Sequence, residues 1–370
     1  MRKGWRKLKL GEFCEIRQGK NLAISQLSSG EFPVFGANGI VGFYDDFNFS
    51  SEVVALGCRG SCGTVHLVNE SAWLANNVMA VWPKNKNLAV CKFVALLLET
   101  ADLKSSGVIS GQVQPQITRT SLSPLSCLLP PLTEQKRIVD VVSSVDAYID
   151  ALQQQAITAR TAFLAICEEI VLTGENMKPL HEVASVIMGQ SPEGSTCNTD
   201  GIGTPLLTGP TEFTKRIVGP PRQWTSKETK LSQSGDILFC VRGATAGRIN
   251  IGNYKSVIGR GLAAIRCGNS EDTNFVRFAL LVGLGQLLPA AGGTIFPNIS
   301  QSQLRNFEVS WPSENRRAEL SGLVRSIEEV VLRTEHAIDD AKKLRSGLLF
   351  DLLSGEHEIP TSYDKFLGAA

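Results

Sequence analysis

The sequence lacks the signatures of a membrane protein, of a secreted protein and of the common enzyme classes. It has no run of about 18 apolar residues, and its basic start, MRKGWRKLKLGEF, has no apolar core, so neither a membrane span nor a signal peptide is expected. No phosphate loop (GxxxxGKS or GxxxxGKT), glycine-rich dinucleotide fingerprint, HExxH, GxSxG or NPPY motif occurs. The motifs therefore give little support for a catalytic function in this chain.

Cysteine is present, but not in the pattern of a disulfide framework or a metal site. The nine cysteines are odd in number and irregularly spaced, which fits a reduced cytoplasm. The stretch LGCRGSCGTVH (56–66) places Cys58, Cys62 and His66 four residues apart. A zinc site or a reactive thiol is the functional interpretation, but no fourth ligand and no CxxC pair lies nearby. We favour buried cysteines acting as small apolar residues, and we predict no metal site.

An internal repeat organises the chain. Several short segments recur in the same order about 170–185 residues later, and this common order indicates duplication. The matched pairs are 10–21 with 180–191, 53–68 with 236–251, 92–98 with 277–283, 114–122 with 296–304, and 171–175 with 352–356.

Each copy begins with a stretch rich in β-branched and aromatic residues and glycine turns, and then continues as a long helical pattern. We predict an α+β chain with an internal pseudo-repeat, in which two mainly β domains are separated by two long helices that form an antiparallel coiled coil. The predicted segments are 1–131 for the first β domain, 132–175 for the first helix, 176–312 for the second β domain, 313–356 for the second helix and 357–370 for a C-terminal tail.

Both helices carry apolar residues at alternating steps of four and three, which is a heptad seam. Neither helix can bury such a seam alone, so we expect the two helices of one chain to pair. Pairing with the helices of another chain is the alternative. The predicted interface consists of Ile138, Val142, Val145, Ile149, Leu152 and Phe163 in the first helix and Leu320, Val324, Ile327, Val331 and Ile338 in the second, which continues after a one-residue slip through Leu344 and Leu348.

Charge alternates along the chain although its sum is only +1. The segments 1–131, 132–175, 176–312 and 313–370 carry net charges of +4, −4, +4 and −3. Both predicted β domains are therefore mildly basic and suited to meeting a polyanion, whereas the helices are acidic.

Several segments resemble the specificity subunits of type I restriction–modification systems. LPPLTEQKRIVDVVSSVDAYIDAL (129–152) is similar to the start of their conserved helix, and FPVFGANGIVGFYDDF (32–47) resembles a motif of their target-recognition domains. GQVQPQIT (111–118) and GGTIFPNIS (292–300) resemble the segments before each domain's last strands. The resemblance covers nearly the whole chain. One departure is that the second helix begins WPSENRRAEL and does not repeat PPLTEQKRIV.

This resemblance implies that each target-recognition domain reads one half of an asymmetric bipartite site on double-stranded DNA. The helix pair would set the spacer between the half-sites and would dock two modification subunits. Those subunits would supply adenine methylation with S-adenosylmethionine, and restriction subunits would add nuclease and translocase activity that uses ATP and Mg. The chain itself would be noncatalytic, would hold no cofactor, and would act in the cytoplasm of a bacterium or an archaeon, away from membranes.

Polar side chains at equivalent places in the two copies are the predicted DNA contacts. Amides suit adenine edges, whereas arginine and lysine suit phosphates or guanine. The duplicated Arg-Gly turn places Arg59 and Arg242 at hairpin tips. Asparagines that only form turns and arginines that only face solvent are the alternative interpretation. The candidates are Lys20, Asn21, Asn38, Arg59, Asn76, Asn77, Gln112 and Gln114 in the first domain and Gln190, Ser191, Lys215, Arg216, Arg222, Lys227, Arg242, Arg248, Arg260 and Asn298 in the second.

Two other functions are open at this point. One is a coiled-coil scaffold whose β domains bind proteins and not DNA. The other is a free-standing enzyme that uses Cys58 or Cys62, although the second copy has no matching cysteine pair.

Overall fold

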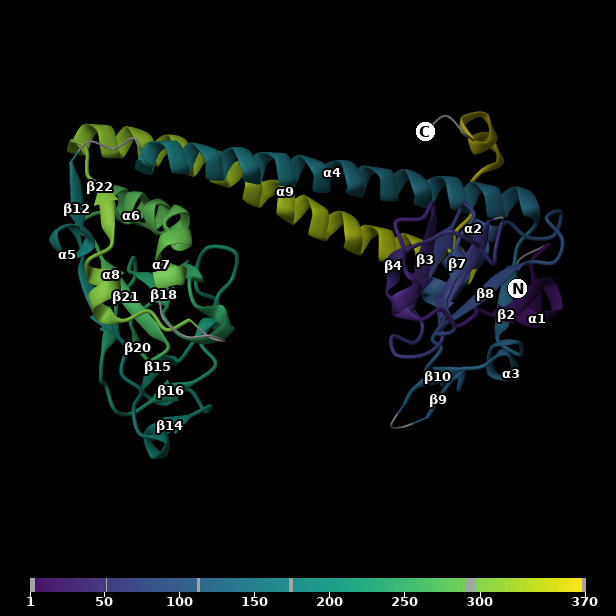
Figure 1. Ribbon diagram of the computed structural model, residues 1–370, viewed down its shortest axis with the longest axis horizontal. Coiled ribbons are helices and arrows are strands. Elements are labelled where there is room, and N and C mark those ends of the chain that lie inside the picture. Colours follow the sequence, from purple (N-terminus) through teal and green to yellow (C-terminus); the bar gives the residue numbers. More distant parts are fainter. Residues whose placement is uncertain (1–3, 51, 112–113, 173–175, 291–296, 368–370) are drawn as a thin grey trace. The chain divides into compact units, whose positions relative to one another are not determined.

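The computed structural model describes residues 4–50, 52–111, 114–172, 176–290 and 297–367 (Figure 1). The chain divides into two units, and the division passes through both long helices. Unit 1 comprises Met1–Ala151 and Ile338–Ala370, and unit 2 comprises Leu152–Ala337. None of the described helices combines the length and the apolar character that crossing a membrane requires.

Unit 1 is built on a four-stranded antiparallel sheet in the order β2 (Cys14–Gln18), β8 (Val78–Pro83), β5 (Val53–Gly57) and β6 (Val65–Val68). Every residue of the central strand β5 is buried. Because side chains alternate along a strand, Val54 and Leu56 join the core that includes helix α2 (Cys91–Thr100), whereas Val53 and Ala55 join a second core on the other face. A smaller sheet, β4 (Gly39–Tyr44), β3 (Phe32–Gly36) and β7 (Trp73–Leu74), contributes Leu74 to that second core.

Unit 2 repeats this plan. Its four-stranded sheet has the order β13 (Ser185–Met188), β21 (Leu262–Arg266), β18 (Ile237–Cys240) and β19 (Ile249–Ile251). Ile237 and Phe239 face the core that includes α6 (Ser270–Val282), and Leu238 and Cys240 face the other side. The second sheet is larger than in unit 1 and runs β14 (Cys197–Asn198), β16 (Trp224–Thr225), β15 (Thr204–Leu207), β20 (Ser256–Ile258) and β17 (Leu231–Ser232). The shared strand order confirms the pseudo-repeat.

Short elements complete each unit. In unit 1 they are β1 (Arg6–Lys9) paired with β11 (Ser126–Leu129), β9 (Ile109–Ser110) paired with β10 (Gln116–Ile117), α1 (Leu10–Phe13), α3 (Arg119–Leu122), and the 3-10 turns η1 (Ile24–Gln26) and η5 (Thr361–Phe366). In unit 2 they are β12 (Met177–Pro179) paired with β22 (Glu308–Ser310), α5 (Leu180–Val183), α7 (Leu284–Ala290), α8 (Gln301–Arg305), and the turns η2 (Gly194–Thr196), η3 (Pro210–Glu212) and η4 (Gly243–Thr245).

The two long helices are α4 (Leu132–Leu172) and α9 (Glu314–Ser354). Residues 173–175, where the first helix is predicted to end, lie outside the described residues. The helices run antiparallel, because Arg345 of α9 pairs with Asp146 of α4 in unit 1, whereas Glu335 pairs with Arg160 in unit 2. The predicted fold class is therefore confirmed. The division into four segments and a tail stays a prediction, since the contacts define only the two units.

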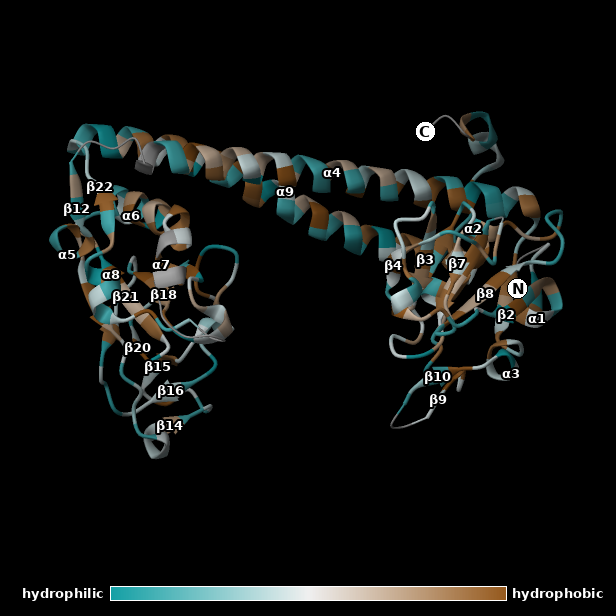
Figure 2. Cartoon of the chain, viewed as in Figure 1, coloured by the Kyte–Doolittle hydropathy of each residue, from teal (hydrophilic) through white to brown (hydrophobic). Residues whose placement is uncertain are grey.

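Polar and apolar positions alternate along both helices (Figure 2). Apart from Leu344, most of the predicted interface residues are buried, and the rest are partly buried. Ile138, Val142, Ile149, Phe163, Leu320, Val324, Val331 and Ile338 are buried, and Val145, Leu152, Ile327 and Leu348 are partly buried. In unit 2, for example, Phe163 packs in one cluster with Val324 and Val331.

The expected continuation of the seam through Leu344 is wrong, because this side chain is 66% exposed. Its neighbour Arg345 takes the inward position, where its guanidinium meets Glu99 and Asp146. The apolar side of the helix then continues at Leu349, which is 1% exposed.

Candidate nucleic-acid interface

The predicted contacts of the first domain gather at one edge of the main sheet of unit 1. In the antiparallel order β2-β8-β5, strands β2 and β5 end where β8 begins, since Gln18 lies opposite Met79 and Gly57 opposite Val78. The loops that follow β2 and β5 and the loop that precedes β8 therefore meet. We call this loop cluster, with residues 19–21, 36–38, 58–60, 75–77 and 114–116, turn edge 1.

Glycine lets the backbones at turn edge 1 approach each other closely. A Cβ atom at Gly19 would lie 2.2 Å from the carbonyl oxygen of Ala75, so only glycine fits there. The backbone N–H of Lys20 donates to the carbonyl of Leu74 at 2.9 Å, and the Asn76 side chain Nδ2 donates to Asn21 Oδ1 at 3.0 Å. Lys20, Asn21 and Asn76 are exposed and lie side by side.

The Arg-Gly turn joins the same edge. The carbonyl of Asn77 accepts the backbone N–H of Cys58 at 2.9 Å, and Arg59 forms a β-bridge with Gln116. Gly60 has a φ of +73°, a conformation that favours glycine, and no atom lies within 4 Å of where its Cβ would be. Backbone contacts therefore hold the base of the turn and leave its tip open, where the exposed Arg59 and Gln114 line a pocket.

Asn38 reaches turn edge 1 from the smaller sheet. Strand β3 runs parallel to β7, so the turn after β3 and the segment after β7 lie at the same end. The carbonyl of Ala37 in this turn lies 3.2 Å from His66 Nε2 and also accepts a hydrogen bond from the Thr64 hydroxyl. These contacts hold the exposed Asn38 at the tip.

Unit 2 forms the same arrangement, which we call turn edge 2 (residues 189–191, 241–248, 259–261 and 297–298). A Cβ atom at Gly189 would lie 2.1 Å from the carbonyl oxygen of Gly259, and Gly243 has a φ of +79°. Arg242 forms a β-bridge with Asn298, as Arg59 does with Gln116. The exposed candidates that meet at turn edge 2 are Gln190, Ser191, Arg242, Arg248, Arg260 and Asn298.

Four candidates of the second domain lie elsewhere. Lys215 and Arg216 point to helix α9, where their side chains pair with Glu335 and Glu328 at 3.6 Å each. Lys227 pairs with Glu193 at 2.8 Å, two residues beyond Ser191, and the exposed Arg222 lies in the loop before β16. In the first domain, Gln112 lies outside the described residues.

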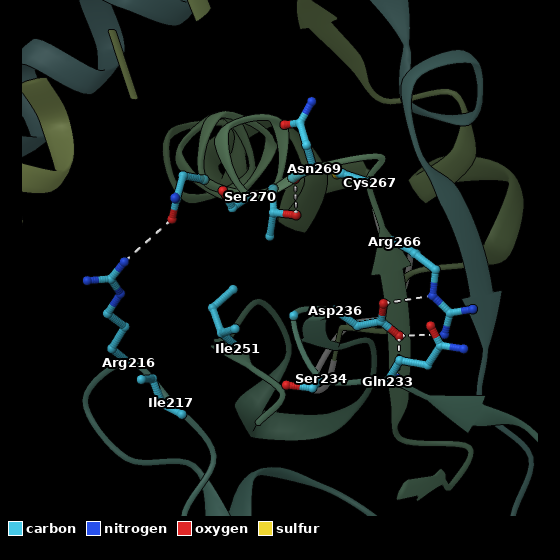
Figure 3. A pocket seen from close by; sticks show the side chains of 13 residues that line it. Arg216, Ile217, Gln233, Ser234, Asp236, Ile251, Arg266, Cys267, Asn269 and Ser270 are labelled. Atoms are coloured by element: carbon cyan, nitrogen blue, oxygen red, sulfur yellow. Dashed lines mark hydrogen bonds and ion pairs between the residues drawn. The ribbon is translucent and has the colours of Figure 1, made fainter. Parts of the chain in front are cut away.

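Arg216 borders a pocket of about 420 Å³ at the opposite edge of the main sheet of unit 2 (Figure 3). Across this pocket, Asp236 is 2% exposed and holds Arg266 by two hydrogen bonds of 2.7–2.8 Å. Its carboxylate also accepts the backbone N–H of Gln233 at 2.7 Å. The arrangement ties the start of β18 to the end of β21 and stabilises the sheet away from turn edge 2.

Sequence reasoning missed Gln116. Its bridge to Arg59 gives it the place that Asn298 holds beside Arg242. The signal was present, since aligning 114–122 with 296–304 pairs Gln116 with Asn298.

Cys58 and Cys62, the two cysteines of LGCRGSCGTVH, belong to no group of side chains that could hold a metal ion among the described residues. Cys58 is 0% exposed in the core of unit 1, and burial raises the pKa of its thiol. The thiol of Cys62 donates to the carbonyl of Pro115 at 2.9 Å, and His66 is engaged with Ala37. In the parts of the chain that the structure describes, no three His, Cys, Asp or Glu side chains are placed to hold a metal ion.

The chain thus contains two copies of one fold, and each copy presents exposed amide and guanidinium groups at the same edge of its sheet. Residues 2–159 and 174–318 match the family described as the type I restriction modification DNA specificity domain. The chain belongs to this family.

Relatives and solved structures agree with this assignment. The chain is 27% identical over 269 residues to a protein named as the specificity subunit of the type I restriction enzyme MjaX from Methanocaldococcus jannaschii, covering 67% of this chain and 63% of that one. It is 24% identical over 159 residues to a type I specificity subunit from Mycoplasma pneumoniae, covering 41% and 43%. It thus spans less than two thirds of the length of either relative.

The fold is that of a solved S subunit of a type I restriction-modification system from M. genitalium. The TM-score is 0.63 at 15% identity, and the match covers 96% of this chain and 97% of that one. A second structure, from a study of complex assembly and conformational transition of the type I R-M system, gives a TM-score of 0.60 at 22% identity, with 95% and 98% covered.

Proposed function

We propose that this chain is the DNA-recognition subunit of a type I restriction–modification complex, in which turn edges 1 and 2 each contact one half of an asymmetric bipartite site. The observation that carries the proposal is that one backbone framework occurs twice with different exposed side chains. Arg59 and Arg242 keep the same place in both, whereas the neighbouring amides and arginines differ. A shared framework suits contacts to the DNA backbone, and the differing side chains suit two different base sequences.

Within this proposal, helices α4 and α9 set the spacer and dock two modification subunits. Large apolar side chains point to solvent on both helices, which marks surfaces suited to a protein partner. In unit 1 these are Tyr148, Leu344 and Phe350, and in unit 2 they are Ile157, Leu164, Leu323 and Val330. The two helices begin with different sequences, so the two docks would not be identical.

The catalytic groups of such a complex belong to its partners. S-adenosylmethionine would bind the modification subunits, and ATP and Mg the restriction subunits, in the cytoplasm of a bacterium or archaeon. The family match does not favour the alternative of a scaffold without a DNA role.

Selection from randomised double-stranded DNA tests the proposal. The chain is purified together with a co-expressed modification subunit, and bound DNA is sequenced after several rounds. We expect one motif with two defined halves and a fixed undefined spacer. Enrichment of a single contiguous motif, or of none, would contradict the proposal. Nonspecific binding to the phosphate backbone is removed by raising the salt concentration, because such binding weakens steeply with salt.

A further inference from the structure

One pair of positions has the same backbone setting in both turn edges but different side chains. Four backbone hydrogen bonds align the two edges, so that Asn21 corresponds to Ser191 and Asn76 to Arg260. They are Gly19 N to Val78 O (3.0 Å) and Lys20 N to Leu74 O (2.9 Å) in unit 1, and Gly189 N to Leu262 O (2.9 Å) and Gln190 N to Ile258 O (2.8 Å) in unit 2. A third matched pair is Cys58 N to Asn77 O and Val241 N to Gly261 O, both 2.9 Å.

In unit 1 the pair consists of two amides. Asn76 Nδ2 donates to Asn21 Oδ1 at 3.0 Å, and the Asn76 carbonyl accepts from Gln18 Nε2 at 2.8 Å, which fixes the backbone that carries the amide. Both side chains are exposed. Among the described residues, nothing bonds to the Asn21 amide nitrogen or to Asn76 Oδ1. The pair therefore leaves the whole NH2 group of Asn21 free as a donor and Asn76 Oδ1 free as an acceptor.

In unit 2 the pair consists of a serine and an arginine. The Ser191 hydroxyl accepts the backbone N–H of Arg260 at 3.2 Å, so the serine supports the loop. The exposed Arg260 guanidinium makes no hydrogen bond or ion pair within the described part of the chain. It presents donors only, because a guanidinium has no acceptor.

We propose that these paired positions make the two half-sites differ: Asn21 and Asn76 read an adenine in one half, and Arg260 reads a guanine in the other. The major-groove edge of adenine offers the N7 acceptor and the N6 amino donor, which match the donor and acceptor of the amide pair. Guanine offers N7 and O6, two acceptors that match a guanidinium. The adenine meant here is distinct from the base that becomes methylated, and the inference rests on the proposed function.

Single-atom changes in DNA test the inference. The full chain in complex with its modification subunits is titrated with its selected site, in which adenines are replaced one at a time by 7-deazaadenine and guanines by 7-deazaguanine. These bases lack the N7 acceptor. In the half-site that unit 1 contacts, 7-deazaadenine at one position should weaken binding about tenfold or more, and in the other half-site 7-deazaguanine should do so.

Variants assign these effects to residues. Asn21→Ala should weaken binding of the unmodified site and abolish the further loss from 7-deazaadenine, because the free donor that meets N7 is the Asn21 amide nitrogen. The response to 7-deazaguanine in the other half should persist, which shows that the protein is folded. Arg260→Ala should give the reciprocal result. Asn76→Ala should also weaken binding of the unmodified site, because it removes the acceptor that meets the N6 amino group and the hydrogen bond that holds Asn21. Asn87→Ala changes an exposed asparagine on the loop before α2 and should change nothing.

Several outcomes would overturn the inference alone. These are a wild-type complex that binds its site but tolerates every 7-deaza base, full sensitivity to 7-deazaadenine that survives in Asn21→Ala, or a guanine as the sensitive base opposite unit 1. A wild-type complex with no bipartite site would instead remove the proposed function, and this inference with it.

Discussion

At the residue scale, the duplicated Arg-Gly turn gives matched single substitutions. Arg59→Ala should weaken binding through the half-site of unit 1, and Arg242→Ala through that of unit 2, each by about 1–3 kcal/mol if a base edge is contacted. Binding is measured by fluorescence anisotropy on DNA with either half-site altered. Lys86→Ala serves as the control, because Lys86 is an exposed residue in the loop after β8, at the opposite edge of the sheet. Equal effects of both arginine variants on both half-sites would contradict separate reading.

The two thiols of the Arg-Gly stretch provide a second residue-scale prediction. Cys58→Ala with Cys62→Ser should leave DNA binding within about twofold of the wild type, since neither thiol is part of the reading surface in this account. Burial raises the pKa of both thiols, so the thiolate is scarce at pH 8 and alkylation by iodoacetamide should be slow until the protein unfolds. Rapid alkylation of native Cys58, or loss of DNA binding in a folded double variant, would revive a chemical role.

Much of the candidate site could be predicted from residue types and from the internal repeat. The prediction was wrong where a side chain pairs with a residue far away in the sequence. Alignment of the two copies pairs Arg59 with Arg242 and Gln116 with Asn298. The charge of Lys215 suggested a phosphate contact. Its pairing with Glu335 depends on how the second domain packs on α9, and the local sequence holds no trace of that packing.

At the element scale, buried charge joins α6 to α9 in unit 2. Arg277 and Glu328 are 5% and 9% exposed and form a hydrogen bond of 2.5 Å, and Arg216 approaches the same carboxylate at 3.6 Å. Glu328→Gln should destabilise unit 2 by about 3–5 kcal/mol, because it leaves a buried guanidinium without its counter-charge.

Urea unfolding monitored by tryptophan fluorescence measures this destabilisation, and the matched control is Glu335→Gln. Glu335 is also on α9, but its partners Arg160 and Lys215 are 3.6–3.7 Å away and more exposed, so its removal should cost about 0–1 kcal/mol. Equal losses from the two variants would show that the buried pair has no special part in joining the helix to the domain.

The long helices were the most predictable elements. Apolar residues at heptad spacing predict which side of a helix is buried, even when the element that covers this side is unknown. The heptad pattern wrongly predicted that Leu344 is buried, because the neighbouring Arg345 takes the inward position. Arg345 turns inward since Glu99 and Asp146 both reach it, at 2.6 Å for its contact with Glu99. A hydrophobic pattern cannot anticipate such an ion pair with a residue of α2.

At the scale of the whole molecule, the duplication was visible in the sequence, but the order of the strands was not. The pairing of β2 with β8 joins residues 61–69 positions apart, and the register comes from packing on both faces of the sheet. The order β13-β21-β18-β19 in unit 2 repeats the order β2-β8-β5-β6 in unit 1, so both units pack their main sheet in the same way.

The helix pair makes a prediction about the spacer. Inserting four residues into both α4 and α9 lengthens each by about 6 Å, or roughly one helical turn. We expect the selected DNA motif to keep both half-sites and to gain about two base pairs of spacer, since base pairs rise about 3.4 Å. Matched substitutions of four residues that preserve helix length are the control. A selected motif that keeps the original spacer would contradict the proposed role of the helix pair in setting the spacing.

The central claim, that this chain directs a modification complex to a bipartite DNA site, is tested most directly by mapping adenine methylation across a genome. Cells that carry the modification subunit are compared with and without this chain. The account predicts methylation of one asymmetric bipartite motif that disappears when the chain is absent and returns when it is restored. Methylation that is unchanged by its removal, in cells with an intact modification subunit, would contradict the account.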